Sequence, residues 1–139
     1  MNVALLQNLV DYGIMGLLGL LSILSVWLFI ERKLFYRSLD LSAYTSKKRF
    51  EIAITKHLTT IATIASNAPY IGLLGTVLAI MITFFTMQEA GMDAAKITAA
   101  LALALKTTAA GLLVAILSIV FYNTLVRDTE RLLVEYEER

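Results

Sequence analysis

The chain has 139 residues, 58% of them hydrophobic and 17% charged, with a formal net charge of +1 and no cysteine. Soluble domains contain about 45–50% apolar and about 25% charged residues, so a soluble fold of this length would leave much apolar surface in water. The composition indicates a membrane protein and excludes a disordered chain. The absence of cysteine excludes a disulfide scaffold and a thiolate metal site.

Three segments are long and apolar enough to cross a bilayer as helices. Residues 12–30 and 69–87 contain no charged side chain, and 97–126 contains one, Lys106. The apolar runs are continuous rather than alternating, which indicates helices. Since about 20 apolar residues of helix cross the hydrocarbon core, we expect an all-α membrane protein with transmembrane helices at 12–30, 69–87 and about 99–122.

The distribution of lysine and arginine predicts the orientation. The segment 31–68 carries seven of these residues and 127–139 carries three, whereas 1–11 carries none and 88–96 carries one. Basic residues favour the cytoplasmic side. We therefore expect 31–68 and 127–139 in the cytoplasm, and 1–11 and 88–96 outside. No signal peptide is expected, because no basic residue precedes the first apolar segment.

The segment 31–68 is expected to be helical. Its apolar residues recur at helical spacing and form one face: Phe50, Ile54, Leu58, Ile61 and Ala65. Asp40 or Ser42 is the candidate cap of this helix. Together with 127–139, which continues the third helix, the segment predicts a small cytoplasmic bundle. The basic run 47–49 is interpreted as a solvated face beside a membrane, not as a nucleic-acid site.

Small, weakly polar residues form a stripe along each of the last two hydrophobic segments. One stripe consists of Gly72, Thr76, Ala79, Thr83 and Thr86, and the other of Ala104, Thr108, Gly111, Ala115 and Ser118. In membranes such residues mark close helix contacts. Two interpretations stay open: packing between helices of one subunit, or lining of a shared interior occupied by another helix or by water.

The two stripes are expected to match in depth. Thr76 lies 12 residues before Gln88, and Thr108 lies 12 residues after Lys96. At about 1.5 Å per residue, both hydroxyl groups would lie about 18 Å below the outer link. They are therefore candidates for a polar ring near the middle of the membrane.

Lys106 is the one ionisable side chain inside an expected span, and no Asp or Glu lies in any of the three. A charge in the bilayer is costly, which makes Lys106 a functional candidate. The alternative is that its long side chain reaches the outer interface. If the protein works with protons, the titrating carboxylate is expected to belong to a partner.

Pro69 is the single proline of the chain. It is interpreted as a bend at the cytoplasmic end of the second span, because a helical pattern continues on both sides of it. The alternative is a helix that starts here with Asn67 as its cap.

Two stretches carry a family resemblance. The first runs from Ala68 to Val77 and reads APYIGLLGTV; the second runs from Ala104 to Ile116, reads ALKTTAAGLLVAI, and is followed by Phe121-Tyr122-Asn123. In this order and separation they resemble the MotA/TolQ/ExbB proton-channel family, most closely its ExbB branch. The match covers roughly 66–125, and the whole chain, 1–139, is interpreted as one domain of this type.

The resemblance implies a subunit of a molecular motor. Members of this branch form homopentamers in the bacterial inner membrane, with the second and third helices around a central pore and lipid outside. The pore holds the single membrane helices of ExbD, which carry a protonatable aspartate. TonB is coupled outside the ring and acts on outer-membrane transporters of iron chelates and cobalamin. An ExbD-like protein and a TonB-like protein are thus the implied partners, and 1–11 and 88–96 would be periplasmic.

The resemblance also assigns residues. Thr76 and Thr108 would be the pore threonines that face the aspartate of the partner, and Thr107, Lys106 and Thr83 are the further candidates for the ion pathway. Helix packing is assigned to Gly72, Gly75, Gly111 and Pro69. Two positions depart from the family pattern: Leu103 stands where the pore glutamate is expected, and Leu117 stands where proline is common.

The expected function is therefore a proton-driven motor subunit rather than an enzyme, because no nucleophile–base pair, metal cluster or phosphate loop is evident. His57 is solitary, so no metal or other cofactor is expected. Three alternatives stay open: a TolQ-like subunit that serves envelope constriction, a small self-contained proton-coupled transporter, and a purely structural membrane anchor.

Overall fold

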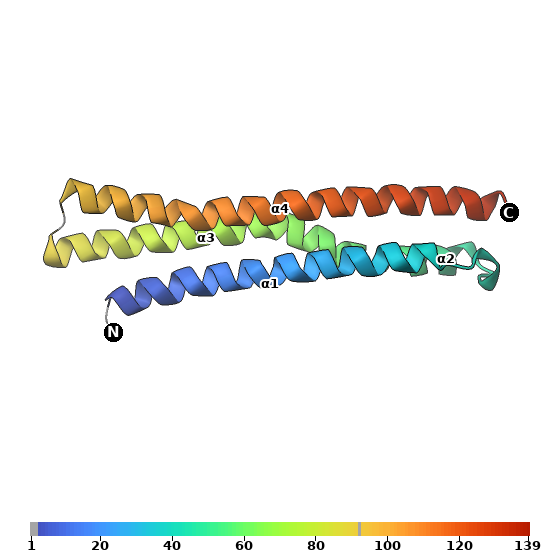
Figure 1. Ribbon diagram of the computed structural model, residues 1–139, viewed down its shortest axis with the longest axis horizontal. Helices are drawn as coiled ribbons and strands as arrows, with labels where there is room; N and C mark the ends of the chain where they lie inside the picture. Colours follow the sequence, from blue (N-terminus) through green and yellow to red (C-terminus); the bar gives the residue numbers. More distant parts are fainter. Residues whose placement is uncertain (1–2, 92) are drawn as a thin grey trace.

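Helices make up most of the part of the chain that the structure describes, residues 3–91 and 93–139. The coordinates are a computed structural model. The elements in chain order are α1 (Val3–Arg37), the short 3-10 helix η1 (Leu41–Ala43), α2 (Lys47–Thr55), α3 (Leu58–Ala90) and α4 (Ala94–Glu137). In Figure 1, α1, α3 and α4 run side by side along the long axis of the molecule.

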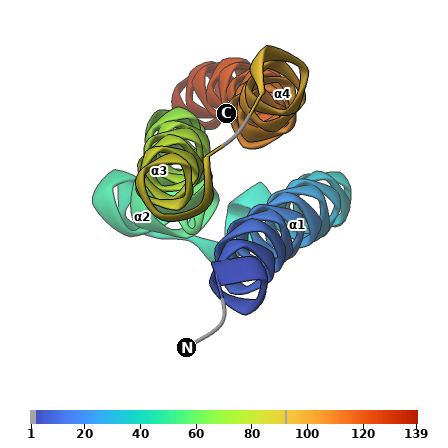
Figure 2. The same ribbon diagram turned by 90° about the vertical axis from the view of Figure 1, so that its left-hand side faces the viewer.

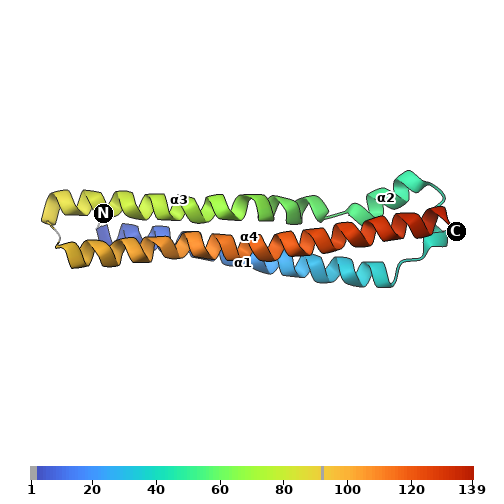
Figure 3. The same cartoon turned by 90° about the horizontal axis from the view of Figure 1, so that it is seen from above.

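The three long helices are arranged so that α3 and α4 form the most extensive contact and α1 packs against both. Seen from one end, the three are distinct rods and α2 lies behind α3 (Figure 2). The start of α1 lies toward the end where α3 stops and α4 begins, whereas α2 and the C-terminus lie at the opposite end (Figure 3). Polar groups near these two ends would therefore lie on opposite sides of a membrane.

The helices α1, α3 and α4 are each long and apolar enough to cross a membrane. The expected spans 12–30, 69–87 and 99–122 fall inside α1, α3 and α4 respectively. Large apolar side chains such as those of Ile23, Trp27 and Leu113 face outward. Such a surface suits hydrocarbon rather than water. The positions at which each helix enters and leaves the membrane stay predictions.

Short polar side chains cap the N-termini of several helices. Asp93 accepts a hydrogen bond from the Lys96 amide at 2.8 Å and so caps α4. Ser46 caps α2 by accepting from the Arg49 amide. The expectation that Asp40 or Ser42 caps this helix is wrong. Asp40 instead caps η1, because the chain turns once more before α2 begins.

The expected apolar face of 31–68 is buried in the structure, but it does not belong to one helix. Phe50, Ile54, Leu58, Ile61 and Ala65 are all at most 8% exposed. The helix breaks between α2 and α3, where His57 has a φ of +71°. Because Phe50 stacks on Tyr136 of α4 with ring centroids 4.6 Å apart, the face packs against the last helix despite the break.

Side chains of α1 compensate for this break. The four last carbonyl groups of a helix lack partners within it. The Arg32 guanidinium donates to the Ala53 carbonyl at 3.0 Å, and the Tyr36 hydroxyl donates to the Ile54 carbonyl. Burial raises the pKa of Tyr36 to about 12, and the hydrogen bonds from Arg32 lower the pKa of the Glu31 carboxyl. The end of α2 is thereby attached to α1.

Candidate functional site

The small-residue stripes of α3 and α4 face each other in the structure. A Cβ atom added to Gly72 would lie 2.4 Å from the carbonyl oxygen of Thr107, and one added to Gly111 would lie 2.5 Å from that of Ala68. Real Cβ contacts are never so short, so both glycines are needed for this approach of the two backbones. At this level the stripes meet within one subunit.

Gly75 lies where all three long helices meet. A Cβ atom there would be 2.7 Å from the Thr107 hydroxyl oxygen of α4 and 3.0 Å from Cγ2 of Ile14 in α1. The first segment of the chain is therefore part of the same contact. The two small-residue stripes predict a contact of the second and third hydrophobic segments only, so the part played by α1 is a finding of the structure.

Three threonine hydroxyl groups form a cluster between α3 and α4. The Thr76 hydroxyl donates to the Ala104 carbonyl at 2.8 Å, and its oxygen lies 3.3 Å from that of Thr107 and within hydrogen-bond reach of Thr108. Thr107 also reaches the Gly72 carbonyl at 3.0 Å. The expected match in depth between Thr76 and Thr108 is confirmed.

Within this hydroxyl cluster the members differ in exposure. Thr76 and Thr107 are 6% and 3% exposed, whereas Thr108 is only partly buried. A hydroxyl group has one hydrogen to donate and can accept at the same time, so Thr76 donates to the Ala104 carbonyl and accepts from Thr108. The hydroxyl cluster is therefore a connected polar path from the interior of the subunit to the surface at Thr108.

Lys106 forms an ion pair that the sequence did not predict. Its ammonium group lies 3.1 Å from a carboxylate oxygen of Asp11 in α1. Asp11 is the last residue of the expected outer segment 1–11, and it lies within α1, which begins at Val3. The structure thus gives Lys106 a carboxylate partner within its own chain, whereas a titrating carboxylate on a partner protein stays a prediction.

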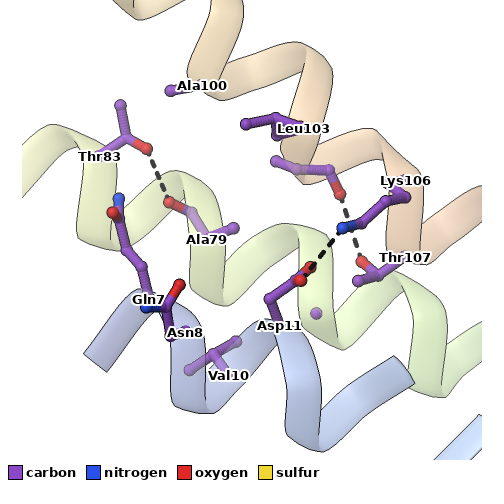
Figure 4. Close-up of a pocket in the computed structure, with 12 residues that line it drawn as sticks. Gln7, Asn8, Val10, Asp11, Ala79, Thr83, Ala100, Leu103, Lys106 and Thr107 are labelled. Atoms are coloured by element: carbon purple, nitrogen blue, oxygen red, sulfur yellow. Dashed lines mark hydrogen bonds and ion pairs between the residues drawn. The ribbon is translucent and has the colours of Figure 1, made fainter. Parts of the chain in front are cut away.

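Asp11 and Lys106 border a cavity of about 200 Å³ between the three long helices (Figure 4). Thr83 also lines it; this side chain is 1% exposed and donates to the Ala79 carbonyl of its own helix at 2.9 Å. Thr83 therefore lies apart from the hydroxyl cluster. Leu103 lines the same cavity, so the position that departs from the family pattern lies beside Lys106 rather than in the hydroxyl cluster.

Pro69 lies inside α3, well after its start at Leu58. The alternative of a helix that begins here is wrong, and the Asn67 side chain donates to the Thr63 carbonyl instead of capping a helix. Proline has no amide hydrogen, so the Ala65 carbonyl lacks its normal helical donor. In α4 the helix is continuous through Leu117.

The described residues contain no group of three His, Asp or Glu side chains placed to hold a metal ion. The groups that this region offers are hydroxyls, carbonyls and one ion pair, all between long apolar helices. Such an arrangement defines a multi-pass membrane protein with a polar interior suited to handling ions or protons.

Comparison with known proteins identifies the family. Residues 28–138 match the MotA/TolQ/ExbB proton channel family. A Helicobacter pylori protein named for biopolymer transport, ExbB-like 2, is 50% identical over 133 residues, which cover 95% of this chain and 89% of that protein. The biopolymer transport protein ExbB of Aquifex aeolicus is 48% identical over 133 residues, covering 95% and 90%. That of Helicobacter pylori strain J99 is 46% identical over 130 residues, covering 93% and 90%.

The chain therefore belongs to the MotA/TolQ/ExbB proton channel family. The relatives above place it on the ExbB branch, and the TolQ alternative is not favoured. The family describes a proton channel, which is not an enzyme class. The two motifs quoted from the sequence lie within the matched range.

Proposed function

We propose that this chain is the ring-forming subunit of a proton-driven motor of the TonB–ExbB–ExbD type in the bacterial inner membrane. Copies of the chain, five by the family pattern, surround the membrane helix of an ExbD-like partner that carries an intramembrane aspartate. Proton flow drives movement of that partner within the ring. A TonB-like protein transmits the work to outer-membrane transporters of iron chelates and cobalamin.

The hydroxyl cluster is the observation that carries this proposal. Carbonyls of Gly72 and Ala104 hold Thr76 and Thr107 in fixed positions, and Thr108 stays accessible at the surface. Hydroxyl groups solvate a carboxylate and relay its proton without becoming charged. A carboxylate of the partner that reaches Thr108 would therefore meet a hydroxyl group that its contact with Thr76 already positions.

The charge distribution supports the direction of flow. The basic residues of 31–68 and 127–139 favour the cytoplasm for the α2 end. The Asp11–Lys106 pair then lies toward the side from which protons enter. One proton that crosses 100 mV supplies about 2.3 kcal/mol, so a few protons per step suffice for mechanical work.

Uptake measurements in the native bacterium test the proposal. Deletion of the gene is expected to abolish energy-dependent uptake of ferric chelates and cobalamin. Thr108→Ala is expected to lower uptake about tenfold or more, which corresponds to about 1.4 kcal/mol. Thr108→Ser, which keeps the hydroxyl, should retain uptake at equal abundance in the membrane. Normal uptake in the deletion strain, combined with sensitivity to detergents, would overturn the proposal in favour of an envelope-constriction role.

A further inference from the structure

The cavity between α1, α3 and α4 has polar side chains on its wall, although the three helices are apolar. Its volume is about 200 Å³. Six polar side chains line it, two of which are charged: Gln7, Asn8, Asp11, Thr83, Lys106 and Thr107. Figure 4 shows these residues converging from three helices, with the Asp11–Lys106 pair at one end.

The cavity has an outer and an inner end. Since α1 and α4 run opposite to α3, Gln7, Thr83 and Ala100 lie toward the end where α3 meets α4, and Asp11 and Thr107 lie deeper (Figure 4). Thr107 belongs both to the cavity wall and to the hydroxyl cluster. The inner end is therefore continuous with the hydroxyl cluster of Thr76, Thr107 and Thr108.

Water is the occupant that this chemistry favours. One water takes about 30 Å³ of liquid, so the space suits several molecules, each with polar partners on the wall. The ion pair is incompletely covered by protein, since the Lys106 and Asp11 side chains are 47% and 32% exposed. If lipid hydrocarbon contacted these two charged groups, they would lose their solvation at a high cost in free energy. Water in the cavity solvates them and avoids that cost.

We propose that this cavity is a water-filled proton entrance within each subunit, leading from the outer end to the hydroxyl cluster. Protons pass along the water to Thr107 and from there to Thr76 and Thr108. For this transfer the single O–H hydrogens of Thr107 and Thr76 rotate from the Gly72 and Ala104 carbonyls, to which they donate in the structure, toward the next hydroxyl oxygen. Each hydroxyl group that takes up one proton gives one up, so no side chain changes its charge. Asp11 neutralises Lys106, so the inner end carries no net positive charge against an arriving proton. The role of the entrance in proton supply rests on the proposed function.

Cysteine labelling tests the entrance, and the chain has no cysteine of its own to interfere. Ala100 lines the cavity, whereas Ala102, two residues further into the expected span, faces outward from the helix bundle and does not line it. We compare Ala100→Cys with Ala102→Cys in the assembled complex. The probe is a small membrane-impermeant methanethiosulfonate, added to one side of the membrane at a time.

Only a hydrated thiolate reacts with this reagent. Ala100→Cys is expected to react about tenfold or more faster than Ala102→Cys, and only from the periplasmic side. Adding Ala79→Phe, which fills the cavity from the facing wall, should slow this reaction to the control rate. If Ala100→Cys does not assemble, Ala79→Cys serves as the labelled position, with Ala100→Phe as the filling change.

Equal rates at Ala100 and Ala102, reaction from the cytoplasmic side alone, or no effect of filling would each overturn the proposal of a water-filled entrance. The labelling requires no iron uptake. Rapid, one-sided labelling together with normal uptake in the deletion strain would therefore contradict the proposed function and leave the water-filled cavity standing.

Discussion

Lys106 of α4 and Asp11 of α1 form an ion pair across 3.1 Å, although 95 residues separate them in the chain. The pair links the first helix to the last at the level where α3 and α4 already touch. It gives Lys106 a partner inside its own subunit. A lysine in a span is therefore no sign, by itself, that a charge faces the pore.

The contributions of Asp11 and Lys106 to the stability of the protein are expected to be coupled. Asp11→Asn and Lys106→Gln each leave one charge without its partner between apolar helices, whereas the double variant leaves none. Because both side chains are partly exposed, we expect the double variant to be more stable than the sum of the single effects by about 1 kcal/mol. Equilibrium unfolding in bicelles measures this coupling. Strictly additive single effects would show that the pair contributes nothing.

The same pair predicts a functional result. Lys106→Ala should impair energy-dependent uptake while the ring remains assembled. Exchange of the charges, Asp11→Lys with Lys106→Asp, should restore part of the uptake. Normal uptake by Lys106→Ala would return this lysine to the role of a side chain that reaches for the interface.

The close approach of α3 and α4 predicts opposite effects of two glycine substitutions. Gly72→Ala forces a methyl group against the Thr107 carbonyl and should destabilise the protein by about 1–3 kcal/mol. Gly13→Ala is the control, because nothing lies within 4 Å of the added atom. There the better helix propensity of alanine should be neutral or stabilising. Thermal unfolding in detergent compares them, and equal effects would contradict the tight contact.

Thr76 should be sensitive to loss of its hydroxyl rather than of its shape. Thr76→Val removes the bond to the Ala104 carbonyl and should cost about 0.6–1.7 kcal/mol of stability and most of the energy-dependent uptake. Thr76→Ser should preserve both. Thr86→Val in the same helix is the matched control, since Thr86 bonds only within its own turn. A harmless Thr76→Ala, Thr108→Ala double variant would instead support a structural anchor.

The raised pKa of Tyr36 predicts that the protein loses stability at alkaline pH. Burial raises its pKa from 10.0 to about 12 in the folded protein. The stabilisation is therefore complete below pH 10 and is lost as the pH rises toward 12. Tyr36→Phe should remove this dependence, at a cost of about 1 kcal/mol near pH 8 for the lost bond to Ile54. Circular dichroism against pH measures it, with the exposed Tyr70→Phe as control. An unchanged alkaline transition in Tyr36→Phe would contradict the assignment.

Sequence reasoning located the three long helices because hydropathy is a local signal that each segment carries by itself. It missed the break at His57, because the apolar spacing from Phe50 through Leu58 to Ile61 stays helical across it. No glycine or proline marks the break. Bonds from Arg32 and Tyr36 on a distant helix stabilise the end of α2 there, and such bonds leave no local signal.

The sequence also predicts one part of the candidate site, the Thr76–Thr108 contact, but not the Asp11–Lys106 ion pair. Depth arithmetic from the outer link brought Thr76 and Thr108 together, because α3 and α4 are consecutive and share one turn. The same arithmetic does not apply to α1, whose height relative to α4 is set by packing at Gly75. The partner of Lys106 therefore required the structure, although Asp11 stood at the edge of the first apolar segment as a signal.

Native mass spectrometry of the protein, co-expressed with its single-span partner and released from the membrane intact, tests the central claim most directly. The account predicts one closed assembly of several copies of this chain, five by the family pattern, that retains the partner helix. A monomer, or an assembly that never holds the partner, would contradict the account.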